Sequence, residues 1–237
     1  MSVTIGQASI DEKNGISGGA AGDQTGRELN TRAWYANGWT LCLRFKDRQK
    51  AQKCAEAAKA LIAGNKVGYD QSQRNTLRAE LRKVDWNPAR LVTPCETDCS
   101  AFAAVCAEAA GVPMEVTYTA GNAPATFQMR QQWAKTGAFE LLTDSKYLTS
   151  DRYLMTGDIL VNESRHACIV LSDGTLASPV TSQSAGTIKM IVNGRECWVP
   201  GHLVGGTNYL NGSVREIFGA MGAYVGNQGS TPVITIK

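Results

Sequence analysis

The stretch that decides the fold is residues 96–102, which read ETDCSAF. It places Cys99 directly after a polar loop, at the start of an apolar, alanine-rich segment. Gly111 and Pro113 end that segment, so the pattern predicts a helix from Asp98 or Cys99 to about residue 110. A helix N-terminus stabilises a thiolate through its unpaired N–H groups and its dipole. Cys99 is therefore a candidate nucleophile at neutral pH.

A nucleophilic thiol needs a base, and the chain contains only two histidines. His166 opens a strand-like run, shortly after another strand-like run, GDILV, at residues 157–161. Cys99 and His166 would meet if the helix packs across the sheet. His202 lies in a tail without a clear pattern, and we interpret it as structural.

The order of the predicted elements indicates an α+β fold. Helices are expected at residues 47–63, 72–84, 98–110 and 125–136, and strands at residues 40–45, 158–161, 166–171 and 175–180. Residues 1–30, rich in Gly, Ser, Asp and Asn, are interpreted as a loop. The tail shows strand patterns at residues 188–192, 197–199 and 233–236 and a possible helix at 214–224.

Composition excludes several classes of protein. A net charge of +3 and a pI near 8.5 suit a polyanionic surface but fall short of a nucleic-acid-binding footprint. No run of eighteen apolar residues occurs, so we expect no membrane span. The N-terminus lacks the basic and apolar regions of a signal peptide, so we expect synthesis in the cytoplasm and export by another route.

The seven cysteines favour free thiols over a disulfide framework, because the count is odd and no signal peptide is apparent. A zinc site built from Cys95, Cys99 and His166 is an alternative. It would need Cys197 or His202 as fourth ligand, and no second CxxC pair supports it. We therefore predict neither a metal nor a cofactor.

Four acidic residues, three of them within the first loop, leave a further alternative open. Asp11, Glu12, Asp23 and Asp70 could build a calcium site or a substrate edge. The D-x-D-x-D-G spacing of a calcium loop is absent, which favours solvated or capping roles.

Three ordered blocks resemble the NlpC-like and CHAP-like cysteine peptidases and amidases that cut peptidoglycan. They are TDCSAF at residues 97–102, GDILV at residues 157–161 and HACIVLSDG at residues 166–174. Upstream strings at residues 8–12, 22–26 and 68–77 are similar to wall hydrolases of phages and mobile elements. The resemblance covers roughly residues 6–180.

The resemblance implies a papain-like core in residues 1–185, with N-terminal helices on an antiparallel sheet. The strand patterns of the tail predict a small β-rich appendage of unassigned role in residues 186–237, either separate or part of the same domain. The resemblance also implies that Cys99 attacks an amide carbonyl of the wall peptide to form a thioester, and that His166 is the base. Asp98 would hold the free amine of the stem peptide, and Ser100 would contact substrate or cap the helix. The partner would be peptidoglycan, reached after phage lysis, from a virion or by non-classical export.

The sequence departs from the family pattern at the group that would orient His166. Asp173 lies in a predicted hairpin turn, roughly 20 Å along the strand from His166. With that turn, Thr181 and Gln183 share the face of His166, and Gln183 is the better imidazole partner. A register slip of one residue would instead select Ser182.

Three other functions remain open from the sequence. One is a virion structural or assembly protein that keeps a papain-like fold without activity. The second is a zinc-binding module, and the third is another cysteine acyl-transfer enzyme such as a protease.

Overall fold

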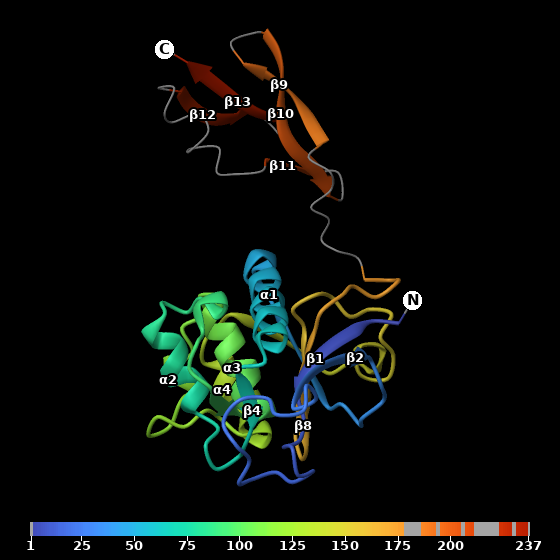
Figure 1. The fold of residues 1–237 in the computed structure, drawn as a ribbon. Helices are drawn as coiled ribbons and strands as arrows, with labels where there is room; N and C mark the ends of the chain where they lie inside the picture. Colours follow the sequence, from blue (N-terminus) through green and yellow to red (C-terminus); the bar gives the residue numbers. More distant parts are fainter. Residues whose placement is uncertain are drawn as a thin grey trace. The chain divides into compact units, whose positions relative to one another are not determined.

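The computed structural model describes residues 2–177 with their side chains, and beyond them the backbone of residues 186–192, 195–204, 207–210, 223–228 and 231–236. The chain divides into two compact units, Met1–Ser178 and Pro179–Lys237 (Figure 1). The combination of helices with a largely antiparallel sheet confirms the predicted α+β class.

The first unit alternates strands and helices along the chain. Its strands are β1 (Thr4–Ala8), β2 (Leu29–Ala33), β3 (Leu41–Phe45), β4 (Val67–Tyr69), β5 (Cys95–Thr97), β6 (Phe139–Leu142), β7 (Ile159–Asn162) and β8 (His166–Val170). Its helices are α1 (Arg48–Gly64), α2 (Thr76–Lys83), α3 (Cys99–Ala109), α4 (Thr126–Ala134) and α5 (Ser145–Leu148). Single 3₁₀ turns are η1 (Pro88–Arg90) and η2 (Met114–Thr117).

Six strands form the main sheet in the order β2-β1-β8-β7-β3-β6, with every neighbouring pair antiparallel. Figure 1 shows α1 to α4 gathered beside this sheet. The larger hydrophobic core joins the helices to one face of the sheet, and a smaller core around Trp39 and Leu160 lies on the other. Strands β4 and β5 form a separate parallel pair.

The predicted helices form where local signals specify them. Asp47 caps α1 by accepting hydrogen bonds from the N–H groups of Gln49 and Lys50, and Asp98 caps α3 at Ala101. Helix α1 turns Cys54 and Leu61 into the larger core, as their spacing predicts. The capping residues thus fix where α1 and α3 begin.

Two sequence-based expectations were wrong. Residues 4–8, expected within a loop, form the interior strand β1, because alternating Val3 and Ile5 bury on one face of the sheet. Residues 175–177, expected to begin a strand, form a turn instead. Strand β8 already has hydrogen-bonded neighbours on both sides, β1 and β7, and so accepts no hairpin partner there.

The second unit contains a five-stranded sheet in the order β11-β10-β9-β13-β12. Its strands are β9 (Gly186–Val192), β10 (Arg195–Val204), β11 (Thr207–Leu210), β12 (Ala223–Gln228) and β13 (Thr231–Ile236). Only β13 and β9 pair in parallel among these strands. Residues 223 and 224 of the possible tail helix begin β12, and its earlier residues lie outside the described part of the chain.

A tight backbone approach at Gly157 joins the helical layer to the sheet. Gly157 has φ +87°, and a methyl group there would overlap the carbonyl of Ala51 in α1. Gly137 also has a positive φ, +66°, but open space surrounds it. An alanine substitution at Gly137 would therefore cause backbone strain alone, whereas one at Gly157 would cause backbone strain and steric overlap.

We expect Gly137→Ala to lower the free energy of unfolding by about 1 kcal/mol, the usual strain of a non-glycine residue at positive φ. Gly157→Ala should lower it by clearly more, because α1 must also move away from β7. Urea denaturation of both variants measures the difference. Equal losses would show that α1 and β7 do not meet at Gly157.

Candidate active site

Cys99 is the first residue of α3 and is only 5% exposed. Helix α3 packs against β8, and the Cys99 thiol lies beside the backbone N–H of Ala167. Ala167 directly follows His166 in β8. The structure therefore brings the start of the helix to the start of the histidine strand.

The N-terminus of α3 does not lower the pKa of the Cys99 thiol enough to ionise it at neutral pH. Burial raises its pKa to about 12, and the charge of Asp98 acts in the same direction. The N–H groups of Ala167 and Ser100 lower the pKa only in part. The expectation of a thiolate favoured at neutral pH by the helix N-terminus was wrong, since loss of hydration outweighs the helix end.

His166 begins β8 and is half-buried. Its Nε2 lies 2.9 Å from Oε1 of Gln7, which also accepts a hydrogen bond from the Tyr35 hydroxyl at 3.3 Å. Gln7 Nε2 in turn donates to Asn30 Oδ1 at 3.3 Å. With its oxygen facing two donors, the Gln7 amide holds the imidazole as the tautomer protonated at Nε2.

Burial, and to a smaller extent the nearby positive charge of Arg32, lower the pKa of His166 to about 4. Asp98 acts in the opposite direction but more weakly. The Trp39 ring, whose centroid lies 6.1 Å from that of His166, is part of the enclosure. The imidazole is therefore neutral at neutral pH.

Gln7 is a hydrogen-bond partner of His166 that the sequence interpretation missed. In the β1–β8 register, Ile5 pairs with Val170 and Gly6 with Ile169. Continuing that register places Gln7 opposite Cys168 and diagonal to His166, on one face of the sheet. The alternation of Val3 and Ile5 was the signal that could have placed Gln7 there. Gln183, the predicted partner, lies outside the described residues.

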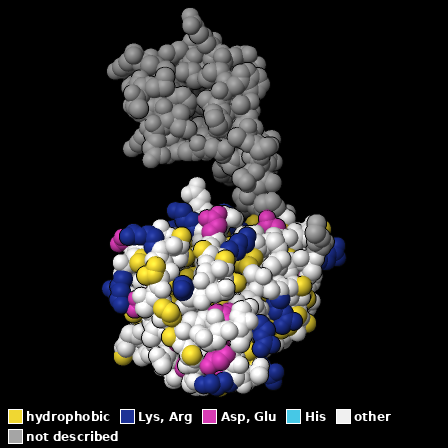
Figure 2. Space-filling model, in the orientation of Figure 1, with side chains coloured by type: hydrophobic (Ala, Val, Ile, Leu, Met, Phe, Trp, Pro, Cys, Tyr) yellow, Lys and Arg dark blue, Asp and Glu magenta, His cyan; other side chains and the backbone are white. Residues whose placement is uncertain are grey.

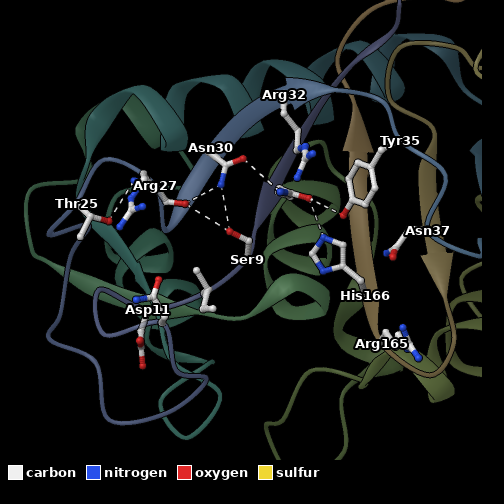
Figure 3. A pocket seen from close by; sticks show the side chains of 13 residues that line it. Ser9, Asp11, Thr25, Arg27, Asn30, Arg32, Tyr35, Asn37, Arg165 and His166 are labelled. Atoms are coloured by element: carbon white, nitrogen blue, oxygen red, sulfur yellow. Dashed lines mark hydrogen bonds between the residues drawn. The ribbon is translucent and has the colours of Figure 1, made fainter.

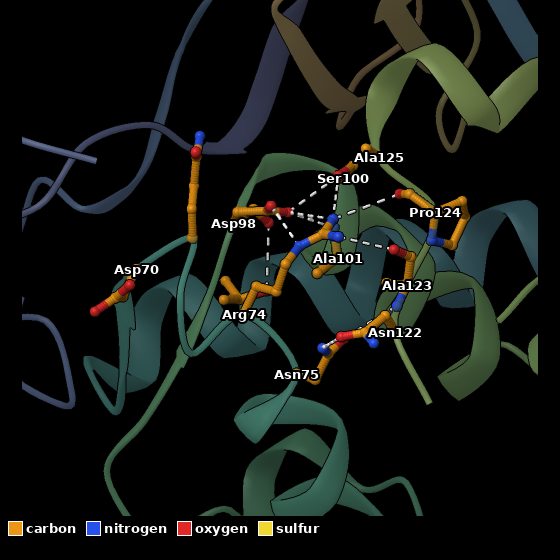
Figure 4. A network of polar contacts seen from close by, with 12 residues as sticks. Asp70, Arg74, Asn75, Asp98, Ser100, Ala101, Asn122, Ala123, Pro124 and Ala125 are labelled. Atoms are coloured by element: carbon orange, nitrogen blue, oxygen red, sulfur yellow. Dashed lines mark hydrogen bonds and ion pairs between the residues drawn. The ribbon is translucent and has the colours of Figure 1, made fainter. Parts of the chain in front are cut away.

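Asp98 and Ser100 belong to a polar network centred on Arg74 (Figure 4). Arg74 Nε lies 2.6 Å from Asp98 Oδ2, and its Nη2 lies 2.6 Å from Ser100 Oγ. Asp98 Oδ1 accepts hydrogen bonds from Ser100 and from the N–H of Ala101. Arg74 also donates to the carbonyl of Ala123. An incoming ammonium group would have to share Asp98 with this guanidinium.

A pocket of about 410 Å³ opens beside His166 (Figure 3). Its lining includes the exposed side chains of Arg27, Arg32 and Arg165, and Asp11 is the single acidic residue among its described lining. Within residues 2–177, none of these three guanidinium groups forms an ion pair. The pocket is therefore positively charged.

The remaining charges of the first unit are mixed. Figure 2 shows Lys and Arg side chains spread over the visible face with Asp and Glu between them. In the described part of the chain, no three or more His, Cys, Asp or Glu side chains are grouped as metal ligands, so Cys95, Cys99 and His166 do not form a zinc triad there. None of the helices described is long and apolar enough to cross a membrane.

The sequence model of one protein family, the endolysin-like domain, matches residues 5–177. That range runs from β1 through β8 and includes Gln7, Cys99 and His166. No curated protein and no solved structure matches the chain. Because the match covers most of the 237 residues, the chain belongs to the endolysin-like domain family, whose name indicates a lysin-type role on the cell wall.

Proposed function

We propose that this protein is a peptidoglycan hydrolase in which Cys99 is the nucleophile, His166 the base and Gln7 the residue that positions the base. The single observation that carries the proposal is the hydrogen bond between His166 and Gln7, formed beside a buried cysteine at a helix start. A nucleophile, a base and an orienting group are the parts that thiol catalysis needs. Membership of an endolysin-like family supports the wall as substrate.

In this proposal the reaction starts from a neutral thiol and a neutral imidazole. Because Nε2 of His166 carries the proton toward Gln7, Nδ1 is free to accept the proton of Cys99 as its sulfur attacks the amide carbonyl. The imidazolium then returns that proton to the leaving amine, which gives a thioester. Water, deprotonated by His166, cleaves the thioester and releases the carboxylate and the free thiol.

Two further parts of the site have proposed roles. The backbone N–H of Cys99, in the first turn of α3, would stabilise the oxyanion together with one more donor. Asp98 and Ser100 are proposed to act on substrate through Arg74, which already holds both side chains. The papain-like arrangement itself is proposed from the helix-on-sheet placement of Cys99 and His166.

The arginine-lined pocket indicates which substrates the proposed enzyme would prefer. Wall peptides carry free carboxylates, and a guanidinium group pairs with a carboxylate through two parallel hydrogen bonds. Arg32 is held in place over the Tyr35 ring, 4.2 Å from its centroid. We propose that Arg27, Arg32 and Arg165 bind carboxylates of the wall peptide next to His166.

Cys99→Ala should abolish clearing of purified cell walls, because no other group replaces the attacking sulfur. The measurement is loss of turbidity, with circular dichroism to verify folding. Cys106→Ala, in the same helix but buried in the core, is the matched control and should still clear walls. Clearing by Cys99→Ala at the wild-type rate would contradict the proposal and favour a non-enzymatic role.

Gln7→Glu should move the acidic limb of the pH–rate profile to higher pH. A carboxylate beside the ring favours the imidazolium and raises the pKa of His166 from its value of about 4. Gln7→Leu, which removes the acceptor, should lower kcat/KM by about 10-fold or more.

The control is Asn30→Asp, which adds the same charge one hydrogen bond further from His166 and should shift the acidic limb of the pH–rate profile less. An unmoved limb in Gln7→Glu would rule out the pairing of Gln7 with the catalytic base.

Replacing Arg27, Arg32 and Arg165 together with glutamine should raise KM for wall peptides with free carboxylates and leave kcat nearly unchanged. Peptides whose carboxylates are amidated should not distinguish this variant from wild type. Glutamine at the exposed cations Lys59, Arg82 and Lys135 gives a control of equal net charge. Equal KM changes in both triple variants would mean that only overall charge matters.

A further inference from the structure

Glu96 is an acidic residue buried without a partner, three positions before Cys99. Its side chain is 1% exposed, and neither carboxylate oxygen has a hydrogen-bond donor within the described residues. A buried ionised carboxylate without donors or a counter-ion costs several kcal/mol. The proposed reaction makes no use of Glu96.

Oxygen atoms converge next to Glu96. A methyl group on Gly68 would lie 2.6 Å from Glu96 Oε2, 2.7 Å from the Gly22 carbonyl oxygen and 3.1 Å from the Ala20 carbonyl oxygen. The Gly22 carbonyl also accepts a hydrogen bond from the Gln24 side chain, and the Ala20 carbonyl accepts none from the described residues. Three acceptors facing one small space repel one another unless a cation lies between them or Glu96 carries a proton.

A second group of oxygens lies alongside the first. A methyl group on Gly19 would lie 3.0 Å from Glu12 Oε2 and 3.1 Å from the Tyr69 carbonyl oxygen. Glu12 Oε2 and Asp11 Oδ2 are buried atoms without donors in residues 2–177. The other Glu12 oxygen contacts the Ala20 N–H at 3.2 Å and the exposed Lys13 ammonium at 3.5 Å.

The surroundings of Glu96 are acidic. Burial, together with the smaller effects of the charges of Glu28, Asp70, Glu12 and Asp11, raises its pKa to about 8. Glu28 and Asp70 are satisfied by backbone N–H groups, as capping residues are. The unpaired oxygens therefore belong to Glu96, Glu12 and Asp11.

We propose that this pocket, bounded by the Glu96 and Glu12 carboxylates and the backbone carbonyls of Ala20, Gly22 and Tyr69, is a calcium-binding site. Every candidate ligand is an oxygen, which selects a hard cation. Calcium accepts a mixture of carboxylates and carbonyls in irregular geometry, whereas magnesium requires a near-ideal octahedron. The backbone carbonyls take the place of a third acidic ligand, and the half-exposed Glu12 leaves a path from solvent.

Calcium here would connect the site to the pocket beside His166. The carbonyls of Ala20 and Gly22 belong to the loop between β1 and β2, which also carries Arg27 of the pocket. Glu96 lies in β5, which leads through Asp98 into Cys99. The ion would hold this loop against β4 and β5 and so fix one wall of the pocket.

The full chain, freed of metal and titrated with Ca²⁺ at pH 7.5, tests the site. The midpoint of thermal unfolding should rise by about 5–10 °C when Ca²⁺ is in about 100-fold excess over its dissociation constant. Tb³⁺ should give luminescence sensitised by nearby aromatic side chains such as Tyr69, and Ca²⁺ should displace it. Glu96→Gln should lose both responses, and Glu12→Gln should weaken them at least tenfold.

Glu140→Gln makes the same chemical change at an exposed position on β6 and should respond like wild type. Wild type without a Ca²⁺ shift or Tb³⁺ signal, together with a fully stable Glu96→Gln, would overturn the proposal in favour of a protonated Glu96. A Glu96→Gln variant that keeps the wild-type response would place the ion elsewhere and overturn it as well. These readouts do not depend on wall hydrolysis. The calcium-site proposal and the hydrolase proposal can therefore be refuted independently of one another.

Discussion

Antiparallel hydrogen bonding between β1 and β8 joins the first residues of the chain to the strand that begins at His166. Ile5 faces Val170 across this pair, and the register carries Gln7 to the imidazole. A shift of one residue would turn Gln7 to the helical face and remove the acceptor from His166. The position of the His166 ring therefore depends on a contact with a residue 159 positions away in the chain.

Burial imposes the second constraint, because it determines the charge states of Cys99 and His166. The enclosure that raises the pKa of Cys99 also lowers the pKa of His166. Both effects favour the neutral forms and oppose an ion pair in the free protein. The proposed chemistry is accordingly a proton transfer that accompanies attack, assisted by the Gln7 acceptor.

The loop between β1 and β2 serves two neighbouring sites. Its far end supplies Arg27 to the positively charged pocket, and its middle supplies the carbonyls of Ala20 and Gly22 beside Glu96. The middle of the loop thus lies beside acidic groups, whereas its far end carries a positive charge. A cation beside Glu96 would stabilise the loop without neutralising the arginines of the pocket.

Local patterns were sufficient for α1 and α3, for the strands β3, β7 and β8, and for the candidate pair of Cys99 and His166. Capping residues, periodicity and ordered motifs are properties of neighbouring residues, so the sequence by itself determined them. Only the tertiary structure decided that β1 lies beside β8, that Gln7 reaches His166, and that Glu96 meets the oxygens of a distant loop. It also decided the pKa of Cys99, because hydration is lost only when the helix packs against the sheet. These outcomes depend on contacts between distant segments, whose register and burial no local pattern specifies.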